Sequence, residues 1–172
     1  ILAPVVTGQT PKAPAPGEPR TFSFTWDGDG GYLGVQTEEV TRENLGKYNG
    51  IGGKLERDED VASGMIREIR EETGLQATSI TLRGTVCWAD FGPKKQDWLA
   101  FIFVVNEYTG TVANDYEEGT LHWVPLDRLP ELPMWPGDRL FLPLVFDDDS
   151  RLFHGFMRYA DDQPVAWHYE RF

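Results

Sequence analysis

The chain has only one cysteine, Cys87, among its 172 residues. A single cysteine cannot form an intrachain disulfide, so a hydrophobic core has to hold the fold together. The sequence also lacks an apolar run long enough to span a membrane. Because neither secretion nor membrane insertion is indicated, we expect a cytoplasmic protein.

Positive charge is scarce as well. Lys and Arg number 16 against 28 Asp and Glu, which gives a net charge of −12. A chain of this charge is repelled by nucleic-acid duplexes and by anionic membranes, and we exclude both as partners. If the protein acts on a polyphosphate, metal ions are needed to bridge the like charges.

Proline, by contrast, is concentrated at one end of the sequence. Residues 1–20 contain five prolines among Ala, Gly and Thr. A segment of this composition buries too little apolar surface to order itself. We therefore predict a disordered proline-rich tail over residues 1–20 and one domain over residues 21–172. An inert tail is expected, with a docking peptide for a partner as the alternative.

Several short runs alternate apolar with polar side chains, which is the pattern of half-buried strands. The run from Trp98 to Tyr108 is almost continuously apolar and predicts a central strand buried on both faces. A short helix is expected after Pro125, and Asp138 stands where a further helix would begin. The predicted strands cover residues 22–26, 32–36, 79–88, 98–108, 121–126, 152–159 and 165–169. These elements predict an α/β fold of the α+β type.

The stretch that organises the chain runs from Asn49 to Leu75. It opens with glycines, passes through a charged turn and ends in a helix. Apolar residues recur at helical spacing, so one face of this helix can be buried, and Gly74 supplies the left-handed residue that ends such helices. The apolar residues are Val61, Met65, Ile66 and Ile69.

Three glutamates, Glu68, Glu71 and Glu72, lie on one flank of the predicted helix. Carboxylates four residues apart repel each other, so this flank is either a solvated acidic face or a place that holds a cation. The Gly52–Gly53 pair favours the cation, because glycines let bare backbone approach an ion or ligand. Oxygen ligands without His or Cys suit Mg²⁺, with Mn²⁺ as a substitute.

At this point the sequence resembles a known family. Gly53, five residues, Glu59, seven residues and then the run Arg67–Leu75 fit the Nudix box at each of its fixed positions. Motifs outside the box resemble the MutT-homologue branch, which hydrolyses oxidised purine nucleoside triphosphates such as 8-oxo-dGTP. These motifs are residues 48–54, the Met134-Trp135-Pro136 turn with Asp138, and residues 152–156. The likeness covers roughly residues 30–170.

The resemblance implies a mixed β-sheet sandwiched between helices and a role for particular residues. Metal ions would be held by the Gly52 carbonyl, Glu68, Glu72 and Glu118, with Glu71 beside them. Arg67 would orient a carboxylate of the box, and Gly52, Gly53 and Lys54 would lie along the substrate. The base pocket would be lined by Asn49, Trp135 and Asp138, with Trp88 near another aromatic wall.

The activity implied is attack of water on a phosphorus of a nucleoside triphosphate, with Mg²⁺ or Mn²⁺ bound. Either Glu68 or Glu72 would accept the proton of the water. The products would be a nucleoside monophosphate and pyrophosphate. The resemblance leaves both a monomer and a homodimer open.

The sequence departs from this branch at two positions. Gly137 stands where the mammalian-type pocket has the first of two adjacent acids, and Gly119 where a bulky apolar wall is expected. The polar loop 37–47 is mixed in charge rather than basic. These departures keep a broader range open: ordinary (d)NTPs, ADP-ribose or dinucleoside polyphosphates. A non-catalytic nucleotide-binding module is a further alternative, which the complete set of glutamates disfavours.

Overall fold

A computed structural model describes residues 2–7, 31–37, 47–112 and 120–172. Within these residues, eight strands form one mixed sheet in the order β3-β2-β1-β5-β4-β7-β8, and β6 pairs with β2. The pairs β1/β5 and β4/β7 are parallel, and the other pairs are antiparallel. The strands are β1 Leu2–Thr7, β2 Gly31–Thr37, β3 Tyr48–Gly50, β4 Gln76–Phe91, β5 Gln96–Thr109, β6 Thr120–Pro125, β7 Phe153–Ala160 and β8 Gln163–Arg171.

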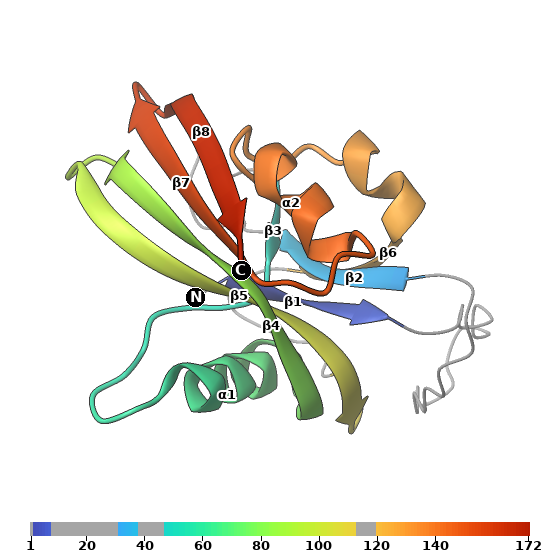
Figure 1. Cartoon of the computed structure of the whole chain (residues 1–172). Coiled ribbons are helices and arrows are strands. Elements are labelled where there is room, and N and C mark those ends of the chain that lie inside the picture. The colour runs from blue at the N-terminus through green and yellow to red at the C-terminus, as the bar shows by residue number, and fades with distance from the viewer. Residues whose placement is uncertain (1, 8–30, 38–46, 113–119) are drawn as a thin grey trace.

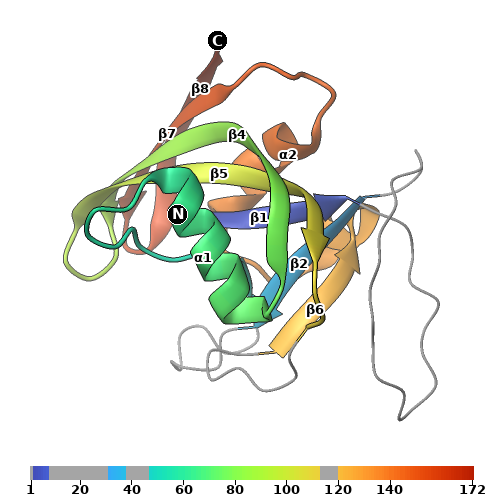
Figure 2. The same ribbon diagram turned by 90° about the horizontal axis from the view of Figure 1, so that it is seen from below.

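Helices cover the sheet on two sides (Figures 1 and 2). Helix α1, Val61–Thr73, lies on one side, and helix α2, Asp138–Phe146, lies on the other with the 3-10 helix η1, Leu126–Glu131. This arrangement confirms the predicted mixed sheet between helices. No helix of the described part of the chain is both long and apolar enough to cross a membrane.

Two apolar clusters form the core, one on each side of β5. Ile102 and Val104 belong to the cluster that α2 covers, whereas Phe103 and Val105 belong to the cluster that α1 covers. Successive residues of a strand point to opposite faces, so β5 is buried on both faces. This confirms the prediction made from its continuous apolar run.

Helix α1 ends at Gly74, as its sequence predicts, and begins after Asp60. Asp60 caps the first turn by accepting hydrogen bonds from the backbone N–H groups of Ala62 and Ser63. Gly74 ends the helix in the left-handed conformation, with φ of 74°. The buried side chains Met65 and Ile69 face the core. The acidic flank is therefore held at a fixed angle to the sheet.

The structure corrects the expected N-terminal tail at its first residues. Leu2–Thr7 is strand β1, which pairs with Leu33 and its neighbours in β2 and with Ile102 to Val105 in β5. The backbone of this short segment is ordered because strands on both sides supply hydrogen bonds, which composition alone does not reveal. Residues 8–20 and the expected strand over 22–26 lie outside the described residues.

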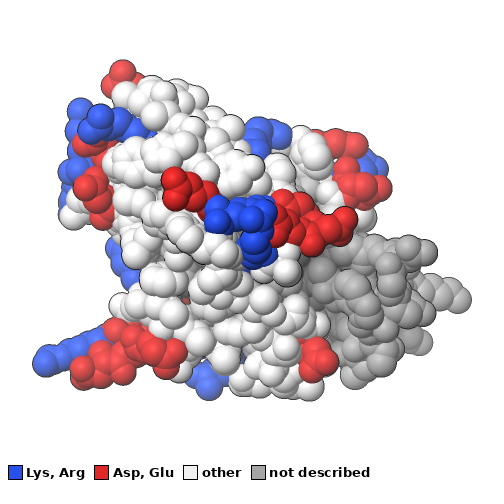
Figure 3. All heavy atoms as spheres, viewed as in Figure 1, with Lys and Arg blue, Asp and Glu red and all other residues white. Residues whose placement is uncertain are grey.

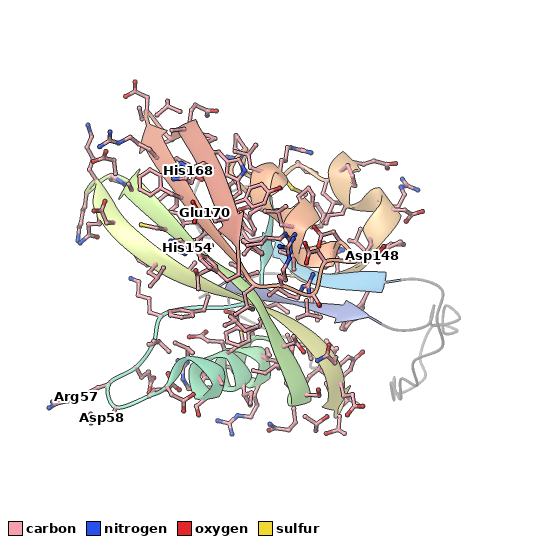
Figure 4. All side chains as sticks on the ribbon, viewed as in Figure 1. Arg57, Asp58, Asp148, His154, His168 and Glu170 are labelled. Atoms are coloured by element: carbon pink, nitrogen blue, oxygen red, sulfur yellow. The ribbon has the colours of Figure 1, made fainter. Side chains whose placement is uncertain are left out.

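The turn after α2 is an ion-paired cluster. Arg83 donates to the Val145 carbonyl and approaches the Asp147 carboxylate, and Arg171 pairs with Asp147 as well. Asp149 pairs with Arg151 at 2.7 Å. Figure 3 shows opposite charges side by side at this place, where Figure 4 labels Asp148. The cluster ties the end of α2 to β4 and β8.

Candidate active site

The guanidinium of Arg67 is the centre of the acidic flank of α1. Its Nε and Nη2 donate to the two oxygens of Glu59, both at 2.9 Å. Its Nη1 donates to Glu68 and to Glu71, also at 2.9 Å each, and Nη2 further donates to the Lys54 carbonyl at 3.1 Å. One side chain thus joins the loop before α1 to three carboxylates.

This arrangement explains how so much negative charge is tolerated. The side chains of Arg67, Glu59 and Glu68 are only 13–15% exposed, so water screens them weakly. The hydrogen bonds from Arg67 lower the pKa of Glu59 below its usual value. The same bonds, with Glu59 as the strongest partner, raise the pKa of Arg67 despite its burial. Both shifts favour the charged forms of Glu59 and Arg67.

Two glutamates of the flank reach the glycine loop that precedes α1. The Gly52 backbone N–H lies 3.3–3.4 Å from the two carboxylate oxygens of Glu72 and donates to them. A Cβ added to Gly53 would lie 2.3 Å from Oε1 of Glu68, so residue 53 can only be glycine if Glu68 keeps this position. Gly52 also has φ of 147°, which side chains rarely adopt. Both glycines of the predicted pair are thus required by geometry.

The donor set at this place fits a divalent cation that is shared with a phosphate. Glu68 uses one oxygen to bind Arg67, and no described residue donates to its other oxygen. Glu72 is half-buried, and Glu71 is 52% exposed. Among the described residues, no three acidic, His or Cys side chains form a ready-made metal cage. A hard cation here would complete its shell with water and substrate oxygens, as Mg²⁺ usually does.

The charged turn between the loop and α1 stands apart from this group. Figure 4 shows Arg57 and Asp58 at its tip, pointing away from the body of the protein. Their side chains are 95% and 90% exposed. Lys54 lies nearer the core, with its Nζ 5.0 Å from the ring centroid of Trp98. The structure therefore leaves the tip of the turn outside the candidate site.

The residues predicted to bind the base come from the other side of the sheet. Asn49 lies in β3, and the backbone N–H of its neighbour Tyr48 donates to the Pro133 carbonyl at 2.8 Å. This bond holds β3 against the turn that carries Trp135. The ammonium of Lys47 lies 3.3 Å from the centroid of the half-buried Trp135 ring. One face of that ring is therefore occupied by a cation.

Asp138 opens helix α2, as predicted, and its carboxyl is poorly solvated. Burial raises its pKa to about 7, although neighbouring Arg139 acts in the opposite direction. Burial also raises the pKa of Tyr159 to about 12, with the charge of Asp138 as a second cause. The two side chains are therefore close enough to affect each other. The Asp138 carboxyl therefore gains or loses its proton near neutral pH.

Trp88 belongs to the core. It is 8% exposed and packs in the cluster beneath α2, with its ring centroid 5.4 Å from that of Phe91. Its indole N–H is buried and has no hydrogen-bond partner among the described residues. Phe91 in turn lies 5.0 Å from the Tyr159 ring. Trp88 is therefore linked to the Asp138 region through packed aromatic rings.

Sequence reasoning assigned no role to three neighbours of the predicted residues. Glu59, the bidentate partner of Arg67, stands at a fixed position of the box and could have been found there. Lys47 and Tyr159 meet Trp135 and Gly137 only in three dimensions, although the alternating pattern of β7 does place Tyr159 inward. Glu118 and Gly119 lie outside the described residues.

Comparison with known proteins identifies the family of the chain. A family model described as the NUDIX domain matches residues 19–145. The chain is 36% identical over 134 residues to YvcI of Bacillus subtilis, an uncharacterized Nudix hydrolase, covering 74% of this chain and 84% of that protein. It is 30% identical over 121 residues to an oxidized purine nucleoside triphosphate hydrolase of Mus musculus, covering 70% and 74%.

Among solved structures, the chain resembles a MutT protein from Bacillus halodurans. The TM-score is 0.69 at 27% identity, and the match covers 83% of this chain and 90% of the other. The similarity therefore extends well beyond the box.

The poorly solvated carboxyl of Asp138 predicts a pH-dependent cost to stability. Its pKa is about 7 in the folded protein against an ordinary 3.8, so the folded state holds the proton more tightly than the unfolded state. The cost is absent below about pH 4, grows as the pH rises and is complete above about pH 7. Asp138→Asn should remove it. Between pH 5 and pH 8.5 the melting temperature of the variant should therefore fall less than that of the wild type. Each kcal/mol of destabilisation that the substitution removes corresponds to a difference of roughly 2–4 °C.

Thermal unfolding monitored by circular dichroism at several pH values measures this difference. Asp148→Asn is the matched control, because Asp148 is exposed and should follow the wild type. Parallel pH profiles for the wild type and Asp138→Asn would show that the Asp138 carboxyl is solvated.

Proposed function

The chain belongs to the Nudix family of hydrolases, and from this we propose that it cleaves nucleoside triphosphates into a nucleoside monophosphate and pyrophosphate, with oxidised purine nucleotides such as 8-oxo-dGTP as preferred substrates. Enzymes of this family act on phosphoric anhydrides and generally use divalent metal ions. The observation that carries the proposal is the convergence of the Glu68 and Glu72 carboxylates on the glycine pair 52–53, with Arg67 locking the helix to the loop.

The phosphate end of the substrate would lie along this glycine loop. Without side chains at positions 52 and 53, the backbone can approach a phosphate group closely. The proposed metal ligands are the Gly52 carbonyl, Glu68, Glu71, Glu72 and Glu118. When bound there, Mg²⁺ or Mn²⁺ supplies positive charge against the polyphosphate and lowers the pKa of a nearby water.

The protein's own contribution to the chemical step is proton acceptance in a fixed geometry. Glu72 or Glu68 accepts the proton of the attacking water. Arg67 keeps Glu68 in place through a charge-assisted hydrogen bond, and the Gly52 N–H does the same for Glu72. Because the charged transition state of phosphoryl transfer is stabilised mainly by positioning and electrostatics, a rigid helix against a rigid loop is suited to it.

The base would lie on the other side of the sheet, near Asn49, Trp135 and Asp138. The name of the Mus musculus relative, an oxidized purine nucleoside triphosphate hydrolase, supports an oxidised purine as the substrate. The net charge of −12 makes free nucleotides of the cytoplasmic pool better partners than nucleic-acid duplexes or anionic membranes.

A broader substrate range is the second candidate, and Gly137 favours it. This position offers no side chain that could read a base edge, so ordinary (d)NTPs, ADP-ribose or dinucleoside polyphosphates remain alternatives. A non-catalytic binding module is disfavoured, because Glu68, Glu71 and Glu72 are all present and two of them meet the glycine loop.

A substrate panel tests the proposal directly. With Mg²⁺ or Mn²⁺, 8-oxo-dGTP should yield 8-oxo-dGMP and pyrophosphate, with kcat/KM about tenfold or more above that for dGTP, as a single well-placed polar contact allows. Products are identified by ion-exchange chromatography, and EDTA should abolish turnover. Cleavage of ADP-ribose or dinucleoside polyphosphates in preference to every triphosphate would instead establish the second candidate.

Glu72→Gln should lower kcat by about 10²–10⁴-fold, since it removes a proton acceptor while keeping the size of the side chain. The measurement is pyrophosphate release at saturating substrate. Glu107→Gln, at an exposed position of β5, is the control and should retain wild-type kcat. A folded Glu72→Gln enzyme with undiminished kcat would remove Glu72 from the mechanism.

Trp135→Ala should raise KM about tenfold, because stacking of a base on an aromatic ring contributes roughly 1–3 kcal/mol. Trp135→Phe keeps an aromatic face and should change KM much less. Steady-state kinetics with the preferred triphosphate separate the two variants. Equal KM values for Trp135→Ala and the wild type would assign Trp135 to the core instead.

A further inference from the structure

The backbone conformation at position 137 does not explain why this residue is a glycine. Gly137 has φ of −64° and ψ of −36°, an ordinary helical conformation open to any residue. A Cβ at this position, however, would lie 2.1 Å from the Tyr159 hydroxyl oxygen and 2.7 Å from the sulfur of Met157. The Tyr159 hydroxyl therefore occupies the space that a side chain at residue 137 would need.

The ring that carries this hydroxyl is held rigidly. Tyr159 is 8% exposed and lies in β7, with its ring edge-on to Phe91 at 5.0 Å and 74°. Its pKa of about 12 keeps the hydroxyl protonated at neutral pH, so it can donate a hydrogen bond. No described residue hydrogen-bonds to this oxygen, and it is not among the fully enclosed unpartnered polar atoms. A fixed donor is thus left for a ligand.

We propose that the Tyr159 hydroxyl, with the Asp138 carboxylate beside it, reads the base of the bound nucleotide and is a determinant of base specificity in this chain. The inference rests on the proposed function, because it places the base near α2. It also means that the lack of a side chain at Gly137 is not simply the loss of a base-binding group, because a hydroxyl from strand β7 fills that space.

The pair of groups selects one kind of base edge. The tyrosine O–H donates, and an ionised carboxylate only accepts. An oxopurine such as guanine or 8-oxoguanine offers a carbonyl oxygen next to a ring N–H, which matches one donor beside one acceptor. Adenine in the same orientation would place an amino group at the hydroxyl and a bare ring nitrogen against the carboxylate. We therefore expect oxopurines to be bound in preference to aminopurines.

The experiment measures the affinity of the full chain for monophosphates, which requires no turnover. Dissociation constants for 8-oxo-dGMP, dGMP and dAMP are determined by isothermal titration calorimetry at pH 8.5, where Asp138 is ionised. Tyr159→Phe removes the hydroxyl and keeps the ring. It should weaken oxopurine binding about three- to tenfold, the worth of one hydrogen bond, and change dAMP binding less than twofold. Tyr169→Phe, at a tyrosine that is 45% exposed in β8, is the control and should alter neither.

A double variant separates recognition from packing. Gly137→Asp alone places a side chain against the Tyr159 oxygen and should lower the melting temperature. Gly137→Asp combined with Tyr159→Phe frees that space, so the double variant should be more stable than Gly137→Asp alone. It should not recover the oxopurine preference at pH 8.5, because an ionised carboxylate at residue 137 only accepts hydrogen bonds and cannot replace the donating hydroxyl. If the role of Tyr159 were purely structural, the double variant would recover the preference together with the stability.

The outcomes distinguish this inference from the proposed function. An unchanged ratio of oxopurine to dAMP affinity in Tyr159→Phe overturns the inference, even if the enzyme hydrolyses 8-oxo-dGTP. Absence of binding of all three monophosphates to the wild type overturns it too. If the ratio falls as expected while no triphosphate is hydrolysed, the proposed function fails and the assignment of Tyr159 stands.

Discussion

The interaction on which the site depends is the ion-pair network of Arg67. A helix flank with several carboxylates is unfavourable by itself, because like charges repel more strongly where water is partly excluded. Arg67 offsets this repulsion by binding Glu59 through two parallel hydrogen bonds and by reaching Glu68 and Glu71 with its remaining donor. The bond from Arg67 to the Lys54 carbonyl then fixes the glycine loop to the same helix. Loop and helix are therefore one rigid unit.

In the function we propose, the two sides of the sheet bind different parts of the nucleotide. Helix α1 and the glycine loop offer charge and bare backbone to the phosphates. The turn before α2, β3 and β7 offer aromatic rings, a carboxyl and a hydroxyl to the base. Arginines hold α2 at both ends: Arg139 donates to the carbonyls of Pro130 and Leu132, and Arg83 with Arg171 binds the turn after the helix. The position of Asp138 at the start of α2 is thus fixed from several directions.

Local pattern was enough to predict much of this structure. The helix with its cap at Gly74, the buried strand β5 and the spacing of Arg67 and the glutamates all follow from neighbours close in sequence. The partners of Arg67 within the box were implicit in the same spacing. What could not be predicted depends on contacts between distant segments. The Tyr159 hydroxyl meets Gly137 across two elements, and Lys47 covers Trp135. The prediction of disorder from composition was wrong for residues 2–7, because their order comes from the strands beside them rather than from their own side chains.

The place of β1 in the sheet has a consequence for how the chain folds. In the order of paired strands, β1 is the link between β2 with its neighbours and the larger group formed by β5, β4, β7 and β8. It joins them by setting residue 2 beside residue 102. Pairings between residues so far apart carry a high entropic cost of loop closure and form slowly. During synthesis, therefore, β1 cannot form its pairing with β5, and the two halves of the sheet cannot join, until β5 has left the ribosome.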